Sequence, residues 1–146
     1  MERLLKEGII IDLAHLNKKS FYQVAGCGQK LFCSHTCFDE VCSHKRNLDK
    51  KQIQTIVDSG GLVGLTLVGD FLGGRELENV YNHIDYFIKN FGADNLAIGT
   101  DFYGTEQLPY ELEQYKDFAK LELPQTTLNK IFHKNYYDFQ KTCKQN

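Results

Sequence analysis

The sequence predicts an α/β fold in which about four parallel strands alternate with helices. Short apolar runs begin near residues 9, 31, 62 and 96, and a segment with helical periodicity or helix-capping residues follows each of them. Strands that are separated by helices normally run parallel in one sheet, so this alternation favours βαβ units. No linker or low-complexity segment divides the 146 residues, and we expect one continuous block over residues 1–146.

The first two strands are marked by β-branched and apolar residues. Residues 9–14 are almost continuously apolar, which is typical of a strand buried on both faces. Asn17 is suited to cap the helix that follows, and Gly26 is suited to end it. Residues 31–34 predict the second strand, which is short.

A capping box predicts where the next helix begins. Asp49 is followed three residues later by Gln52, the spacing at which each side chain can bond the other residue's backbone amide. Residues 62–68 predict the third strand. The apolar positions in residues 77–88 then give the strongest helical pattern of the chain, which ends before Gly92.

The C-terminal third predicts one more strand and two more helices. Residues 96–99 form the fourth apolar run. A helix is expected near residues 112–120, and another after Pro124. Four βα units of this kind are compatible with a small open sheet or with half of an eight-stranded barrel, and periodicity does not separate the two.

Composition and charge argue against several classes of protein. The net charge of −2 gives no signature of polyanion binding. The longest apolar runs are far shorter than the ~20 residues of a transmembrane helix. Residues 1–7 are charged and carry no apolar signal core, and the odd count of five cysteines argues against a complete disulfide framework. We therefore expect a cytoplasmic protein that binds neither nucleic acid nor membrane.

Candidate chemical groups follow the predicted strands. His15 comes after the first strand, His35 after the second and Asp101 after the fourth. The carboxyl ends of parallel strands meet at one edge of a sheet, so these side chains are expected to converge. Neutral imidazoles are common ligands of zinc. The alternative is that each histidine only caps its strand or fills a polar position in the core.

Two further groups have competing interpretations. Arg46 precedes the helix at Asp49, and its guanidinium either grips a carboxylate ligand through two parallel hydrogen bonds or forms a surface ion pair with Asp49. His83 lies within a helical pattern and is expected to be structural or solvated.

The cysteines allow a second metal hypothesis. Five soft ligands fall within twelve residues: Cys33, His35, Cys37, Cys42 and His44. They lack the Cys-x2-Cys spacing of structural zinc sites, and small buried thiols are the more common use of such cysteines.

The sequence strings around these residues resemble the renal (membrane) dipeptidase family of zinc peptidases. The resemblance extends in order and spacing across nearly the whole chain. It rests on residues 8–15, Ser34-His35, Lys45-Arg46-Asn47, residues 60–63, residues 83–85, residues 98–104 and Asn135.

The resemblance implies the C-terminal half of a (β/α)8 barrel, namely strands five to eight, and a site that holds two zinc ions. By position, His15 and His35 resemble the family's metal-binding histidines. Arg46 resembles the residue that binds the C-terminal carboxylate of a dipeptide substrate. Asp101 resembles the acid/base that protonates the departing amine.

Other features of the family site have no counterpart in this sequence. The family's His-x-Asp pair and bridging glutamate belong to the first half of the barrel, Tyr103 stands where an aspartate is usual, and residues 136–138 depart from the family's Leu-Arg pattern. We therefore expect the chain alone to be inactive, and we expect the missing N-terminal half or self-association to cover the open barrel. A catalytically inactive remnant that acts as a binding or assembly module, and a small protein structured by zinc on its cysteines, are the alternatives.

Overall fold

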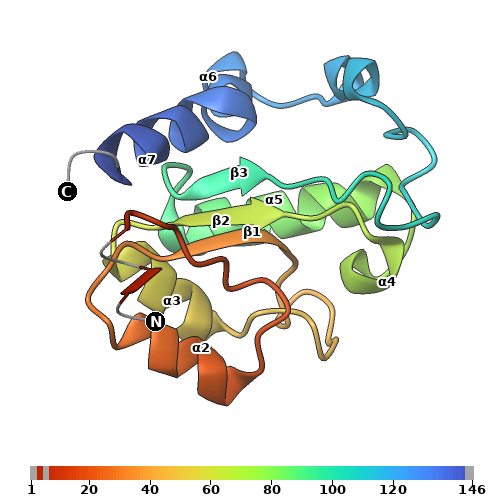
Figure 1. Ribbon diagram of the computed structural model, residues 1–146. Coiled ribbons are helices and arrows are strands. Elements are labelled where there is room, and N and C mark those ends of the chain that lie inside the picture. The colour runs from red at the N-terminus through yellow and green to blue at the C-terminus, as the bar shows by residue number, and fades with distance from the viewer. Residues whose placement is uncertain (1–2, 5–6, 144–146) are drawn as a thin grey trace.

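The computed structural model describes residues 3–4 and 7–143, so part of the charged N-terminal segment lies outside the described residues. Its centre is a parallel sheet in the order β1 (Phe32–Thr36), β2 (Leu62–Leu65) and β3 (Leu96–Ile98) (Figure 1). Phe32 lies opposite Leu62, and Val63 lies opposite Leu96. Three of the four predicted strands are confirmed.

The predicted strand over residues 9–14 is wrong in extent. The segment makes one isolated parallel bridge, between Asp12 and Phe32, and the amide of Leu13 donates to the carbonyl of Phe32 at 2.8 Å. Ile9 and Ile10 are 50% and 39% exposed rather than buried on both faces. The reason is that no strand among the described residues pairs with the outer side of this segment. It lies beside β1 as an incompletely paired edge.

The predicted helix starts are confirmed by their caps. In α2 (Lys18–Ala25) the side chain of Asn17 accepts from the amide of Ser20 at 3.0 Å. In α3 (Lys50–Asp58) Asp49 and Gln52 form both hydrogen bonds of the capping box. α5 (Leu77–Phe91) is the longest described helix and ends at Gly92.

The remaining elements differ in detail from the predicted ones. A short helix, α4 (Gly69–Leu72), follows the third predicted strand. The helix expected at residues 112–120 is a 3-10 helix over Tyr115–Lys120. The last helix is confirmed as three successive pieces: α6 (Gln125–Asn129), a π-helical turn (Lys130–Lys134) and α7 (Asn135–Cys143).

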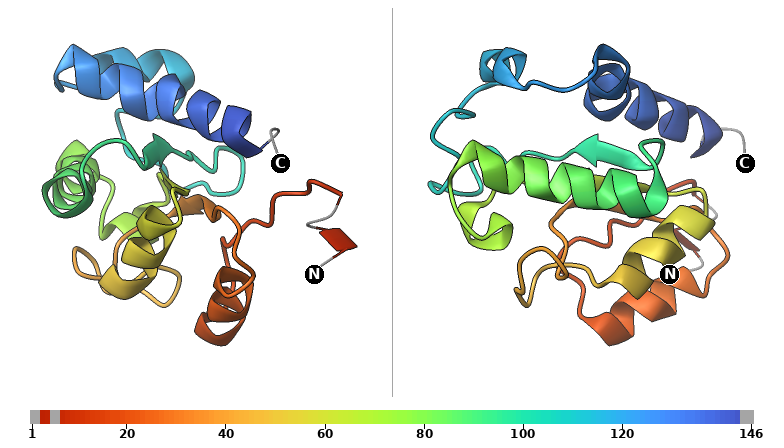
Figure 2. Two further views of the ribbon diagram at one scale, coloured as in Figure 1. Left: turned by 90° about the vertical axis from the view of Figure 1, so that its left-hand side faces the viewer. Right: turned by 180° about the vertical axis from the view of Figure 1, so that it is seen from behind.

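The helices surround a curved sheet. The end view in Figure 2 shows α7, α5, α3 and α2 following one another around the strands. One face of the sheet packs on α3 and α5 and forms the main core. Its fully buried members include Cys33, Val63, Leu65, Ile53, Ile56, Ile84 and Phe87. In the described part of the chain no helix is long and apolar enough to cross a membrane.

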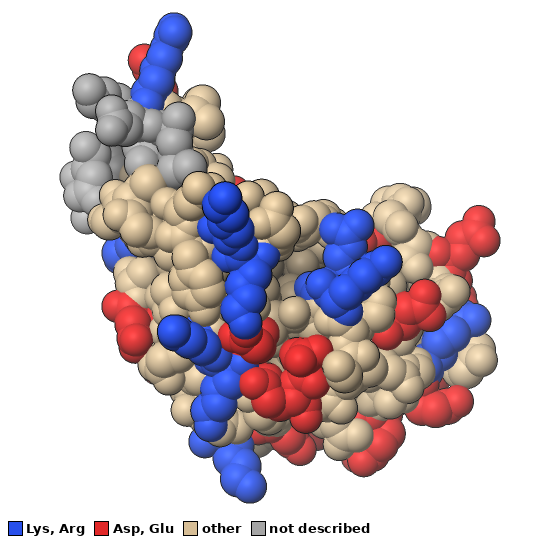
Figure 3. Space-filling view, turned by 90° about the horizontal axis from the view of Figure 1, so that it is seen from below, with Lys and Arg blue, Asp and Glu red and all other residues tan. Residues whose placement is uncertain are grey.

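The face seen from below in Figure 3 carries Lys and Arg side chains interspersed with Asp and Glu. The lysines that begin α2 and α3 are exposed, as expected for solvated helix faces. Lys18 forms an ion pair with Asp49 at 2.5 Å, which links the starts of these two helices.

Candidate metallohydrolase site

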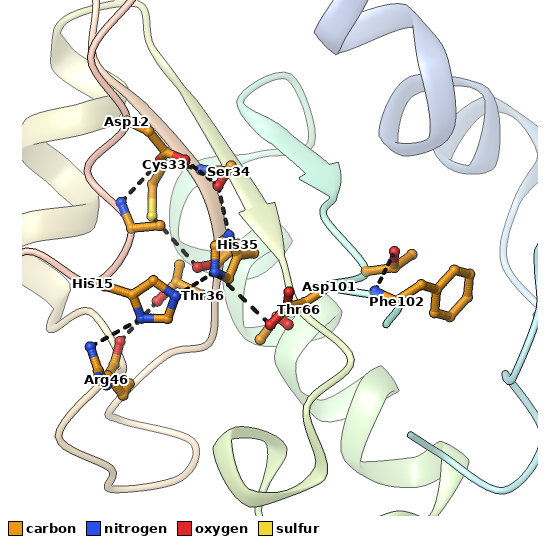
Figure 4. A network of polar contacts seen from close by, with 12 residues as sticks. Asp12, His15, Cys33, Ser34, His35, Thr36, Arg46, Thr66, Asp101 and Phe102 are labelled. Carbon is orange, nitrogen blue, oxygen red and sulfur yellow. Dashed lines mark hydrogen bonds and ion pairs between the residues drawn. The ribbon is translucent and has the colours of Figure 1, made fainter. Parts of the chain in front are cut away.

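His15 and His35 come together at the C-terminal edge of the sheet. Their Nε2 atoms lie 2.7 Å apart, and their rings meet edge to face with centroids 4.6 Å apart (Figure 4). His15 has a φ of 64°, which is left-handed backbone that non-glycine residues seldom adopt. Backbone strain of this kind is concentrated at functional sites.

Asp12 fixes the segment that carries His15. Its Oδ1 accepts from the amide of Ala14 at 3.0 Å and from the amide of Ser34 at 2.9 Å. These bonds tie the turn before His15 to β1. The two histidines are therefore positioned by a shared carboxylate as well as by the sheet.

An irregularity in β1 directs His35 toward this edge. The register of β1 on β2 shifts between Cys33 and Thr36, so Ser34 and His35 occupy a bulge. The bulge brings the carbonyl oxygen of Ser34 over the backbones of two neighbouring strands. A Cβ at Gly64 or at Gly99 would overlap that oxygen, so this close approach requires glycine at both positions.

Asp101 lies beside the histidine pair. Its Oδ2 is 4.0 Å from Nε2 of His35, and the two side chains retain 27% and 20% exposure. Asp101 also has left-handed backbone, with a φ of 56°. The predicted convergence of three strand ends therefore occurs, and the carboxylate stays accessible from solvent.

Arg46 reaches the same cluster from the loop before α3. Its Nη1 lies 3.1 Å from Nδ1 of His15. The side-chain amide of Asn47 holds the loop by donating to the carbonyls of Cys42 and Phe71, both at 2.8 Å. The expected alternative, an ion pair between Arg46 and Asp49, does not occur, because Asp49 pairs with Lys18.

The contact with Arg46 defines the protonation of His15. A guanidinium only donates, so Nδ1 of His15 accepts. Burial, followed by the neighbouring His35 and Arg46, lowers the pKa of His15, and this effect outweighs the opposing carboxylates. His15 is thus favoured as a neutral imidazole, the form that binds metal ions.

Sequence comparison identifies the family. The sequence profile described as membrane dipeptidase (peptidase family M19) matches residues 1–136. This chain belongs to the membrane dipeptidase family. A Klebsiella pneumoniae relative, described as an uncharacterized protein in the pqqA 5′ region, is 36% identical over 119 residues, which are 76% of this chain and 44% of the relative.

Solved structures agree with this membership. A metallo peptidase from Rhodobacter sphaeroides, liganded with a phosphinate mimic of the dipeptide L-Ala-D-Ala, superposes with a TM-score of 0.89 at 28% identity over 96% of this chain and 44% of its own. Dipeptidase AC, a metallo peptidase of family M19, has the same TM-score and identity over 96% and 46%. The probable dipeptidase PvdM from Pseudomonas aeruginosa, at 17% identity and a TM-score of 0.85, shares the fold. The chain spans between 44% and 52% of the length of these relatives.

The donor chemistry of the histidine pair suits a metal ion, because neutral imidazoles are common metal ligands. The two imidazoles face one another through their Nε2 atoms, and Arg46 contacts Nδ1 of His15. No group of three or more His, Cys, Asp or Glu side chains that could hold a metal occurs within residues 3–4 and 7–143. The histidine pair alone therefore offers two of the four ligands of a tetrahedral zinc site.

The cysteine-based zinc hypothesis is not supported by the geometry. Cys33 and Cys37 are fully buried in the dipeptidase core, and burial raises the pKa of both thiols far above its usual range, which disfavours the metal-binding thiolate. His44 instead stacks on Phe71, with ring centroids 4.6 Å apart. Cys33 and Cys37 serve as small apolar groups of the core.

Sequence reasoning missed the supporting roles of Asp12 and Ser34. The sequence feature that could have indicated the role of Asp12 is its position, as a charged residue inside the apolar run before His15. Of the two expected roles of His83, structural or solvated, the structure favours the structural one, because the side chain is fully buried. Its Nδ1 accepts from the amide of Phe38 and its Nε2 donates to the carbonyl of Leu72, both at 3.3 Å.

Proposed function

We propose that this chain forms the C-terminal half of a (β/α)8 barrel and supplies part of a zinc-dependent dipeptidase site. The observation that carries the proposal is the meeting of His15, His35, Asp101 and Arg46 at one edge of the sheet. These are the residues by which the chain resembles the catalytic motifs of its family. The substrate is a dipeptide, and the products are two amino acids.

His35 and His15 would hold zinc through their Nε2 atoms in this site. Zinc bound there would lower the pKa of a coordinated water and polarise the scissile carbonyl. His35 already presents an Nε2 that can accept. His15 gains a free Nε2 lone pair only when its proton moves to Nδ1, and Arg46 must then leave Nδ1, because two donors do not bond each other.

Asp101 and Arg46 would act on the substrate. The accessible carboxylate of Asp101, 4.0 Å from His35, is placed to pass a proton to the departing nitrogen. Once released from His15, the exposed guanidinium of Arg46 can bind the free carboxylate of a dipeptide in two parallel hydrogen bonds. A pocket of about 250 Å³ at this position is lined by Arg46 and His15 and by the ion pair of Lys18 with Asp49, which leaves the guanidinium of Arg46 to bind a carboxylate.

A second segment must complete both the barrel and the site. The exposed Ile9 and Ile10 lie on the unpaired edge beside β1, where another strand would cover them. The first relatives are more than twice as long as the part matched. We propose that an N-terminal half supplies the remaining ligands and covers this edge, with self-association of this chain as the alternative. The chain alone is expected to be inactive.

A chimera tests the function. Residues 1–146 would replace the 44% of the Rhodobacter sphaeroides metallo peptidase on which they superpose. We expect the folded chimera to hydrolyse L-Ala-D-Ala with zinc, the Asp101→Asn chimera to be inactive, and the chain alone to be inactive. A chimera that folds and binds zinc without hydrolysing would favour the inactive-remnant alternative. Hydrolysis that survives Asp101→Asn would contradict the role of that residue.

A further inference from the structure

A line of hydrogen bonds runs from Asp12 through Ser34 to His35, on the side of His35 that faces away from His15 (Figure 4). The hydroxyl of Ser34 contacts Oδ2 of Asp12. The same hydroxyl lies 2.7 Å from Nδ1 of His35. The proposed function gives no role to Oδ2 of Asp12, to the hydroxyl of Ser34 or to Nδ1 of His35.

The chemistry of the carboxylate gives this line a direction. An ionised carboxylate only accepts, so the hydroxyl of Ser34 donates its single proton to Asp12. The Ser34 oxygen can then only accept from Nδ1 of His35. A neutral His35 therefore carries its proton on Nδ1 and has its lone pair on Nε2.

The hydrogen bond at Nε2 of His35 runs in the same direction as the one at Nδ1. Nδ1 of His15 accepts from Arg46, so a neutral His15 carries its proton on Nε2. That proton is donated across 2.7 Å to Nε2 of His35, which must therefore be an acceptor. Both neighbours of the His35 ring thus favour the same tautomer.

We propose that Asp12 and Ser34 are positioning residues that hold His35 in the Nδ1–H tautomer and so present its Nε2 lone pair to the metal ion. This inference rests on the proposed function for its use, but the tautomer itself is a property of the metal-free chain. Hydrogen bonds that orient a histidine ligand commonly change metal affinity by about 10- to 100-fold when they are removed.

Asp12→Asn separates this role from a merely structural one. The amide oxygen of the new side chain keeps the two bonds to the amides of Ala14 and Ser34 that Oδ1 makes. Its NH2 group then faces the hydroxyl of Ser34 and donates to it. The hydroxyl proton is free to turn toward Nδ1 of His35, so the Ser34 side then favours the Nε2–H tautomer and opposes the preference that His15 imposes, without loss of the turn.

The experiment measures two quantities on the full chain at a pH where the histidines are neutral. Ring 15N NMR shifts, without metal, report which nitrogen of His35 carries the proton, and calorimetric titration with zinc reports affinity. We expect Asp12→Asn to move the His35 proton toward Nε2 and to weaken zinc binding about 10- to 100-fold. Asp94→Asn is the matched control, because Asp94 is exposed and pairs with Lys130 at the opposite end of the strands.

Ser34→Ala provides a second variant should Asp12→Asn fold poorly. It removes the hydroxyl and is expected to give a mixture of His35 tautomers with weaker zinc binding. Unchanged His35 shifts in both folded variants would overturn the proposal. If the parent chain has the Nδ1–H tautomer but binds no zinc, the metal assignment of the proposed function fails while the positioning of His35 stands.

Discussion

The Nε2 atoms of His15 and His35 lie 2.7 Å apart, although the two residues come from different βα units. The turn that carries His15 and the bulge that carries His35 are both irregular backbone. A regular strand would direct alternate side chains to opposite faces, so these irregularities bring the two rings together at one edge. Strained backbone that persists at a cluster of titratable groups favours a functional site over a stabilising one.

Arg46→Ala is expected to separate metal binding from substrate binding. Loss of the guanidinium removes the donor on Nδ1 of His15, so zinc affinity should stay equal or rise. In the chimera, KM for a dipeptide should increase about 10- to 100-fold, because a charge-assisted hydrogen bond contributes about 1.5–3 kcal/mol. Calorimetry and steady-state kinetics measure these quantities. Lys89→Ala, at an exposed position of α5 that does not line this pocket, is the control, and weaker zinc binding by Arg46→Ala alone would contradict the account.

Gly64→Ala and Gly99→Ala are each expected to destabilise the fold by about 1–3 kcal/mol or more. Each added methyl would overlap the carbonyl oxygen of Ser34, which is backbone and has little room to move. The free energy of unfolding in urea measures the effect. Gly26→Ala is the control, because a Cβ there would lie 3.4 Å from its nearest neighbour and its φ is −70°. Equal stabilities for all three variants would mean that the bulge in β1 is not as described.

His83 is expected to make the stability of the chain depend on pH. Burial lowers the pKa of His83 from 6.5 to about 4. Between these values the unfolded chain binds a proton that the folded chain does not, so the contribution is complete above pH 6.5 and is lost as the pH falls toward 4. The change amounts to about 3 kcal/mol.

Urea unfolding at pH 7.5 and pH 5 would measure this dependence. His83→Asn is expected to be less stable at both values but to show a smaller difference between them. His133→Asn changes an exposed histidine and should keep the parental difference. If the free energy of unfolding of His83→Asn changed between the two pH values as much as that of the parent does, the effect would come from other groups.

Much of the architecture was predictable because its signals are local. The capping box at Asp49 and the cap at Asn17 depend on residues three positions apart, and both occur as predicted. The prediction for residues 9–14 is wrong because a strand is buried on both faces only when other elements cover it. An apolar pattern indicates that a segment can be buried, but it does not show that a second strand is there to pair with it.

The site was predictable only in part. Strand ends of a parallel sheet meet at one edge, so the meeting of His15, His35 and Asp101 follows from their positions in the pattern. The support of His35 by Ser34 and Asp12 depends on the bulge in β1. No short sequence pattern specifies that bulge, because the contacts that maintain it come from two other strands.

The central claim, that His15 and His35 form the metal-binding part of a dipeptidase site, is tested most directly by calorimetric titration of the chain with zinc. We expect binding by the parent, a loss of more than about tenfold in affinity in His15→Ala and in His35→Ala, and parental affinity in Cys33→Ala/Cys37→Ala and His133→Ala. Loss of zinc in the cysteine variant alone, with both histidine variants binding like the parent, would contradict the claim.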